Sequence, residues 1–120
     1  LKVRVKAAKD LILKMKDNYR KRADQADSIH AEIERSPYPV LVCGDFNDTP
    51  ASYTYRQIRK GLTDGFRDCG SGYQYTFRQL YKLWRIDYVF YSKPLKGHEC
   101  YSPEKSYSDH NMVVWKGIMN

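Results

Sequence analysis

The sequence has few cysteines, only three in 120 residues, and no two of them are spaced as a CxxC pair. An odd number without that spacing argues against a disulfide framework and against a structural zinc site. The three are Cys43, Cys69 and Cys100. Because Cys43 lies inside an apolar run, we expect its thiol to be buried in the core.

Long apolar runs are also missing. No stretch is long enough to cross a bilayer, and the charged, apolar and small-residue order of a signal peptide is not found. The segment starts at Leu1 without a methionine, so an upstream signal or membrane anchor stays open and no localisation is predicted. The 120 residues, with 42% hydrophobic content, suffice for one globular domain, which need not be complete.

Acidic residues are outnumbered, 14 against 21 Lys and Arg, and the excess lies at one end of the chain. Residues 1–22 hold nine basic side chains against Asp10 and Asp17, which accounts for the whole formal net charge of +7. Such a segment attracts phosphate-rich partners such as nucleic acid or anionic lipid. A solvated helix face explains the same charges equally well, so both interpretations stay open.

The first half of the chain shows a helix, a strand and a second helix. Apolar residues recur at three- and four-residue spacing over residues 8–33, which predicts one long amphipathic helix that the prolines of SPYP, residues 36–39, bring to an end. The unbroken apolar run of residues 40–43 predicts a strand covered on both faces. Ser52 is expected to cap a second helix that runs to about Lys60.

The second half is rich in strand patterns. The glycine-rich stretch DGFRDCGSGY, residues 64–73, predicts a loop, with one short turn in it left open. Three β-rich runs follow, YTFRQL, RIDYVFYS and NMVVWKGI, with GHECYS as a weaker candidate between the last two. We therefore expect an α/β (α+β) fold with a long N-terminal helix on one mixed, mainly antiparallel sheet, in which residues 86–91 and 111–118 pair beside residues 40–43.

Polar side chains gather at the ends of these predicted strands. Asp45 and Asn47 follow the first strand, Asp87 lies near the start of a later one, and Asp109 and His110 directly precede the last. If the later strands run antiparallel to the first, all five reach one edge of the sheet, with Asp87 and His110 within hydrogen-bond reach. Three carboxylates, an amide and an imidazole are the groups needed to hold a hard divalent cation and to move protons around a phosphate ester.

Each of these residues also has a purely structural interpretation. Asp45, Asn47 and Asp48 are residues that form Asx turns. Asp87 is explained equally by a strand-edge charge and Asp109 by a strand cap, and a lone histidine is more often structural than catalytic. The functional interpretation rests on their conjunction, in order, each at the matching strand end.

Three motifs together resemble a known family. PVLVCGDFNDTP, RIDYVFYS and YSDHNMVV are similar, in order and spacing, to the last three motifs of the endonuclease/exonuclease/phosphatase superfamily, whose fold is that of pancreatic deoxyribonuclease. RKRADQADSIHAEI also resembles the helix that precedes the Gly-Asp-Phe-Asn motif in that family. The resemblance extends from about Tyr19 to Val114.

The resemblance implies a metal-dependent phosphoester hydrolase, a phosphodiesterase, nuclease or phosphatase. By similarity, Asp45 would orient or deprotonate the attacking water and Asn47 would hold that water or a phosphate oxygen. Asp109 would lie at a Mg²⁺ site that could also take Mn²⁺. His110 would stabilise or protonate phosphate oxygens, with its ring fixed by Asp87. The substrate stays open between nucleic acid, phospholipid headgroups and other phosphoesters.

The chain departs from the family pattern in two ways. Met112 stands where the family usually has proline, which bears on the entry to the last strand more than on the chemistry. The family fold is a four-layered α/β/β/α sandwich of roughly twice this length, and its first half supplies a metal-binding Glu, an Asn and a His that do not precede Leu1. We therefore interpret residues 1–120 as the C-terminal portion of one such domain, and expect weak Mg²⁺ binding and little turnover from it alone.

That interpretation also predicts a partner. The sheet face opposite the residue 8–33 helix should be apolar, and we expect the missing N-terminal half, a second copy of the chain or another partner to cover it. A different class of function stays open beside the enzyme: a non-catalytic polyanion-binding or assembly module that uses the basic N-terminal helix. Salt-sensitive binding that survives loss of Asp45 and His110 would favour this alternative.

Overall fold

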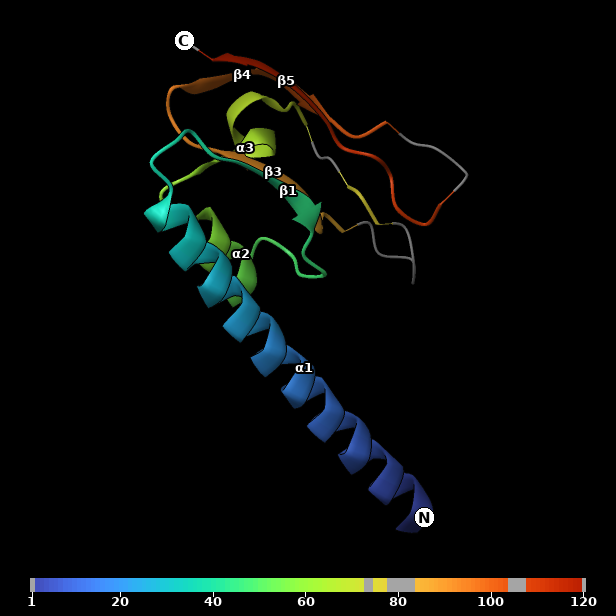
Figure 1. Ribbon diagram of the computed structural model, residues 1–120. Coiled ribbons are helices and arrows are strands. Elements are labelled where there is room, and N and C mark those ends of the chain that lie inside the picture. The colour runs from blue at the N-terminus through green and yellow to red at the C-terminus, as the bar shows by residue number, and fades with distance from the viewer. Residues whose placement is uncertain (1, 73–74, 78–83, 104–107, 120) are drawn as a thin grey trace.

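The computed structural model describes residues 2–72, 75–77, 84–103 and 108–119, in the element order α1, β1, α2, β2, α3, β3, β4, β5. The helices and strands form antiparallel sheets with helices packed on them (Figure 1). The predicted α/β class is therefore confirmed. The predicted strand YTFRQL is described only up to residue 77, and its remainder lies outside the described residues.

The long helix predicted from the apolar spacing is α1, Lys2–Arg35. Its C-terminal part lies beside α2, where Ala26 is fully buried and Ile33 packs against the core. Its N-terminal part extends away from the sheets, and no other helix or strand of the described residues lies beside it (Figure 1). The helix is followed by the SPYP segment, whose Ser36 N–H donates to the Ile33 carbonyl over 3.2 Å.

The first sheet has three strands in the order β1-β3-β2. They are β1, Leu41–Asp45, β2, Thr63–Asp64, and β3, Asp87–Tyr91. Both neighbours of β3 are antiparallel to it, as the strand-end argument requires, and Asp45 is paired directly with Asp87. The carboxyl end of β1 and the start of β3 therefore meet at one edge of the sheet.

The last two strands form a second sheet, so the single sheet that we expected is divided in two. β4, Leu95–Tyr101, pairs antiparallel with β5, Val114–Met119, whereas the C-terminal strand was expected beside β1. Between the two sheets, Trp115 packs on the Tyr91 ring, with centroids 4.9 Å apart. Gly97 lies beside these rings and leaves no room for a side chain, since a Cβ there would lie 2.5 Å from the Tyr91 hydroxyl.

The short helices follow from their caps. Ser52 caps α2, Tyr53–Arg59, through a 3.1 Å hydrogen bond from the Tyr55 N–H, as predicted. The stretch at residues 64–73, expected to be a loop, instead contains the end of β2 and all of α3, Gly65–Cys69. The Asp64 carboxylate accepts a hydrogen bond from the Phe66 N–H, and this cap starts a helix that the glycine content hides.

The hydrophobic core lies between the first sheet and the two longer helices. It comprises Ala26, Tyr55, Ile58, Leu62, Tyr88 and Phe90, with Ile33, Val42 and Phe46 packed against them. Every second residue of β1 faces this core, so the alternate residues face the other way.

The outward face of β1 corrects two expectations. Leu41 is 49% exposed and Cys43 is exposed, so neither the strand covered on both faces nor the buried core thiol is found. The reason is that β1 is an edge strand and the helices pack only on its Val42 side. Within the described residues, no helix is long and apolar enough to span a membrane.

Candidate active site

The turn after β1 presents two of the predicted polar side chains at the sheet edge. The Asp45 carboxylate accepts a 2.9 Å hydrogen bond from the Asn47 N–H, which closes an Asx turn. Asn47 has a φ of 56°, in the left-handed region that asparagine tolerates better than most residues. The turn is anchored to the start of β3, because the Phe46 N–H donates to the Ile86 carbonyl over 2.9 Å. The structural interpretation of Asp45 is therefore correct, but it uses only one of the carboxylate oxygens.

Asp48, the last acid of the turn, has a different place. Its carboxylate accepts a 3.0 Å hydrogen bond from Arg22 on α1, and its backbone carbonyl accepts one of 2.7 Å from the Tyr88 hydroxyl. Asp48 is buried. This residue therefore connects the turn to α1 and β3 and is not part of the side-chain group at the sheet edge.

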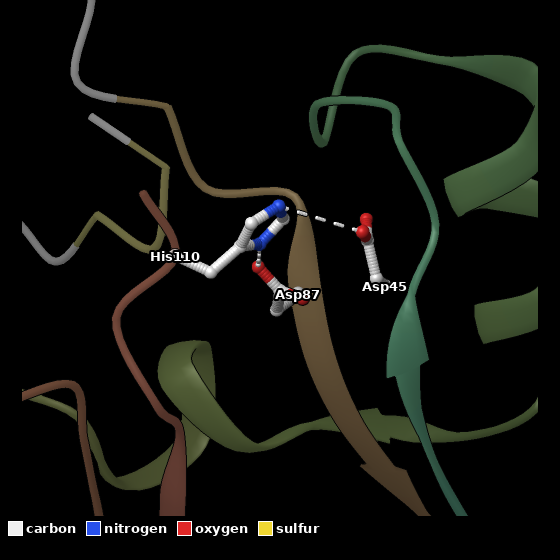
Figure 2. Close-up of side chains that lie close together, drawn as sticks. All are labelled: Asp45, Asp87 and His110. Atoms are coloured by element: carbon white, nitrogen blue, oxygen red, sulfur yellow. Dashed lines mark hydrogen bonds and ion pairs between the residues drawn. The ribbon is translucent and has the colours of Figure 1, made fainter. Parts of the chain in front are cut away.

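The His110 ring lies between the carboxylates of Asp45 and Asp87 (Figure 2). His110 Nδ1 lies 2.9 Å from Asp87 Oδ2, within the range expected from the sequence, and His110 Nε2 lies 3.6 Å from Asp45 Oδ2. The ring is partly exposed, at 31% of its side-chain surface. Both ring nitrogens therefore face carboxylate oxygens, and the Nε2 side remains open enough to contact a further group.

The surroundings of His110 raise its pKa. Burial acts against the imidazolium and lowers the pKa, but the hydrogen bond to Asp87 and the charges of Asp87, Asp45 and Asp109 outweigh it. The pKa of His110 therefore lies above the ordinary value of 6.5. The ring is biased towards its protonated form, in which both nitrogens are hydrogen-bond donors.

The start of YTFRQL, a segment predicted only as a strand, holds His110 from the other side. Phe77 forms isolated β-bridges with Trp84 and with His110, and its ring packs on the imidazole with centroids 5.0 Å apart. Thr76, next to it, is fully buried and contacts the backbone of β3. A lone threonine in a strand pattern has no sequence signal that would mark such a role.

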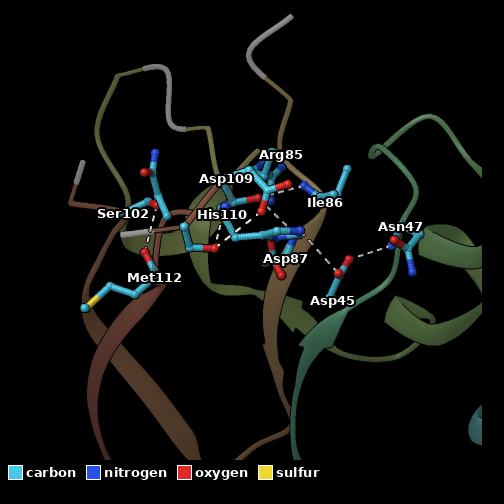
Figure 3. Close-up of polar contacts among 12 residues, drawn as sticks. Asp45, Asn47, Arg85, Ile86, Asp87, Ser102, Asp109, His110 and Met112 are labelled. Atoms are coloured by element: carbon cyan, nitrogen blue, oxygen red, sulfur yellow. Dashed lines mark hydrogen bonds and ion pairs between the residues drawn. The ribbon is translucent and has the colours of Figure 1, made fainter. Parts of the chain in front are cut away.

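The five predicted residues lie together at one edge, but not equally closely (Figure 3). One potential ligand atom from each of Asp45, Asp87 and His110 lies within 4.8 Å of the other two. Asp109 is exposed and lies beside Ser108, whose hydroxyl is 3.4 Å from its carboxylate. Among the described residues Asp109 is outside the close set of three, and it acts on His110 through its charge.

An open hollow of about 560 Å³ adjoins these side chains. Asp45, Asp87 and His110 line one part of it, and apolar groups that include Cys43, Val89 and Met112 line another part. An acid pair, a protonated imidazole and an accessible space can together bind an anionic group and move a proton to or from it.

One family is identified by the comparisons with known proteins. The sequence profile of the endonuclease/exonuclease/phosphatase family matches residues 15–110. A search of curated proteins found no match. Among solved structures, a mannosyl-6-phosphatase from Bacteroides thetaiotaomicron is similar, with a TM-score of 0.72, 18% identity, and coverage of 83% of this chain and 46% of that chain.

Two other solved structures extend the likeness. A family protein from Bacteroides vulgatus has a TM-score of 0.70 at 25% identity, covering 82% of this chain and 44% of its own. The catalytic domain of human Nocturnin, with a bound sulfate anion, has a TM-score of 0.57 at 22% identity, covering 82% and 42%. The chain thus spans less than half the length of the solved structures that it matches.

Proposed function

The chain belongs to the endonuclease/exonuclease/phosphatase family, and from that membership we propose that it forms part of the active site of a divalent-metal-dependent phosphoester hydrolase. The observation that carries the proposal is the position of His110 between two carboxylates, 2.9 Å from Asp87 and 3.6 Å from Asp45. This arrangement raises the pKa of His110, and the ring lines an open hollow.

We assign the proton chemistry from these distances. Asp87 accepts a hydrogen bond from the Nδ1–H group and so fixes the ring, which leaves the Nε2 proton of His110 to stabilise or protonate a phosphate oxygen. The gap between Nε2 and Asp45 is longer than a normal hydrogen bond, so Asp45 remains available to accept a proton from an attacking water. Asn47 at the same edge would hold that water or a phosphate oxygen through its exposed amide.

The donor set at this edge fits a hard divalent cation. Carboxylate oxygens are the ligands that Mg²⁺ and Mn²⁺ prefer, and Asp109 would supply one here while Asp45 handles the attacking water. When bound, the ion would polarise the phosphoryl oxygen and lower the pKa of a water. One carboxylate is too few for Mg²⁺, so we propose that further ligands, among them a glutamate, come from an upstream half of the domain.

The substrate class is tested with a panel. Phosphodiesters, including nucleic acid and phospholipid headgroups, belong in it. Sugar phosphate monoesters belong in it as well, because a protein of similar fold is a mannosyl-6-phosphatase. The substrate that we propose is thus a phosphoester. The partner that we propose for the sheet face that carries Leu41 and Cys43 is the upstream half of the domain.

The experiment compares variants of a longer protein that contains this chain, assayed on the panel with and without Mg²⁺. We expect Asp45→Ala and His110→Ala each to lower kcat about 10²- to 10⁴-fold, the usual contribution of a positioned acid or base. Asp24→Ala on α1 and His98→Ala on β4 are matched controls, since both residues are exposed on elements away from the site. Hydrolysis that needs no divalent ion, or that survives His110→Ala unchanged, would contradict the proposal.

A second function is favoured by one observation. The basic N-terminal part of α1 extends away from the sheets (Figure 1), and Lys16, Arg20 and Lys21, nearer the middle of the helix, are exposed. This geometry suits contact with a polyanion. Salt-sensitive binding of a polyanion that Asp45→Ala and His110→Ala leave unchanged would support a binding module in place of, or beside, the hydrolase.

A further inference from the structure

Asp87 and His110 come from parts of the fold that are not paired directly as strands. Asp87 begins β3, and His110 lies 23 residues further on, ahead of β5, which pairs with β4 in the other sheet. A hydrogen bond of 2.9 Å between their side chains requires both backbones to be held to within a fraction of an ångström. Some other group must therefore fix their separation.

Thr76 is such a group, because it contacts both sides. Its hydroxyl oxygen accepts hydrogen bonds from the backbone N–H groups of Ile86, over 3.0 Å, and Asp87, over 3.1 Å. Its backbone carbonyl accepts one of 2.7 Å from the N–H of Asn111, the residue that follows His110. Thr76 thus bonds to Asp87 through its side chain and to the His110 segment through its backbone.

The neighbours of Thr76 keep this link in place. The Thr76 N–H donates to the Trp84 carbonyl over 2.9 Å, and the Asn111 side-chain amide donates to the Tyr75 carbonyl over 3.3 Å. Thr76 itself has no exposed surface. Water therefore cannot easily replace its hydroxyl as the acceptor for the two N–H groups, and a buried N–H without a partner is unfavourable.

We propose that Thr76 is a positioning residue that sets the separation of Asp87 and His110 through its hydroxyl. The catalytic meaning of that separation rests on the function proposed above. Without the hydroxyl, the first residues of β3 lose their acceptor and Asp87 moves relative to the imidazole. The methyl group of Thr76 fills space, but it does not fix the distance.

A pair of substitutions separates these two parts of the side chain. Thr76→Val keeps the volume and removes the hydroxyl, whereas Thr76→Ser keeps the hydroxyl and removes the methyl group. Thr54→Val is the matched control, because Thr54 is also a buried threonine but lies in α2, away from the sheet edge.

The measurement is NMR of the 120-residue chain at about pH 6, where a histidine with a raised pKa is protonated. Two signals report on the link: hydrogen exchange at the Ile86 and Asp87 amides, and the low-field resonance of the His110 Nδ1 proton. We expect Thr76→Val to speed exchange at both amides about tenfold or more and to abolish the Nδ1 signal. Thr76→Ser should retain both signals, and Thr54→Val should leave them as in the unmodified chain.

Two results would overturn the proposal. One is an unchanged Nδ1 signal in folded Thr76→Val, which would leave the residue a structural role only. The other is equal loss in Thr76→Ser, which would assign the effect to the methyl group. If Thr76→Val does not fold, Thr76→Cys is measured in its place. Sulfur is a weak hydrogen-bond acceptor, so the same losses are expected in Thr76→Cys. Signals in Thr76→Cys that equal those of the unmodified chain would also contradict the proposal. Because no turnover is measured, the outcome is independent of the phosphoesterase assay.

Discussion

At the scale of single residues, His110 combines opposing effects. Partial burial disfavours its charge, and the facing carboxylates of Asp87 and Asp45 favour it more strongly, so the pKa is raised. A group whose pKa differs between the folded and the unfolded chain makes stability depend on pH. The ring therefore gives a signal of the site that can be measured without a substrate.

We predict the direction of that dependence. Because the folded-state pKa of His110 lies above its ordinary value of 6.5, the stabilisation is fully present below that value. It is lost as the pH rises through the folded-state pKa. The measurement is urea unfolding of the unmodified chain and of His110→Gln at a series of pH values. The difference in the free energy of unfolding between the two proteins should shrink as the pH rises. Asp87→Asn should reduce the pH dependence, and a difference that stays constant from about pH 5 to about pH 9 would contradict the prediction.

The sequence predicted the residues of this edge better than their supports. The motifs placed Asp45, Asp87 and His110 correctly because each stands at a strand end, and strand direction decides which ends meet. The sequence did not predict the contacts of Asp48 and Thr76. Asp48 contacts Arg22, and Thr76 contacts the residue 84–87 backbone, and both partners are distant in sequence. Long-range hydrogen bonds of this kind leave no local pattern.

At the scale of elements, Asp64 joins four parts of the fold. Its carboxylate caps α3 and accepts hydrogen bonds of 2.6 Å from Tyr55 on α2 and 2.9 Å from Arg85, just before β3. The carboxylate is almost completely buried, with 1% of its side-chain surface exposed. Arg85 in turn packs over the rings of Phe66 and Tyr88, with its guanidinium carbon 5.0 and 5.1 Å from their centroids.

We predict that Asp64→Ala lowers the free energy of unfolding by about 3–5 kcal/mol, because it leaves the Arg85 charge buried without its partner. Urea unfolding followed by circular dichroism measures this. The double variant Asp64→Leu with Arg85→Met removes both charges and should recover part of the loss, while Asp24→Ala on the exposed face of α1 is the control. A loss below about 1 kcal/mol in Asp64→Ala would show that water replaces the lost partner.

Element boundaries show where sequence patterns are weak. α1, α2 and β3 were predicted because their apolar periodicity or their cap is local. α3 was not predicted as a helix because its five residues carry too little periodicity, and only the Asp64 cap marks it. The partner of β5 was missed because it depends on the packing of Trp115, which no strand pattern encodes.

At the scale of the whole molecule, the outward face of β1 provides a test of the half-domain interpretation. In this chain the Cys43 thiol on that face is exposed, whereas Cys100 is buried and its pKa is raised to about 12 by burial. We predict that Cys43 reacts first with a thiol reagent in the 120-residue chain. In a longer protein that includes the upstream half, its reaction should slow about tenfold or more, because the face is then covered.

The variant Cys43→Ser tests whether the fast reaction with the thiol reagent belongs to Cys43, because this variant should lose the fast phase. The mass of the 120-residue chain in solution tells a second copy from an upstream half, since a dimer that shields Cys43 would show the slow rate without any added segment. Equal rates in the short and the long protein, with the short one monomeric, would argue that nothing covers this face.

The left-handed backbone of Asn47 has a consequence for judging which relatives are enzymes. A chain that kept the turn but had abandoned hydrolysis would still gain from asparagine at this position, because few other side chains accept that conformation. Its presence is thus ambiguous as a mark of catalytic ancestry. The backbone conformation does not require the side chains of Asp87 and His110. Relatives that have lost catalysis should therefore carry substitutions at Asp87 and His110 first, and these two positions distinguish enzymes from inactive relatives.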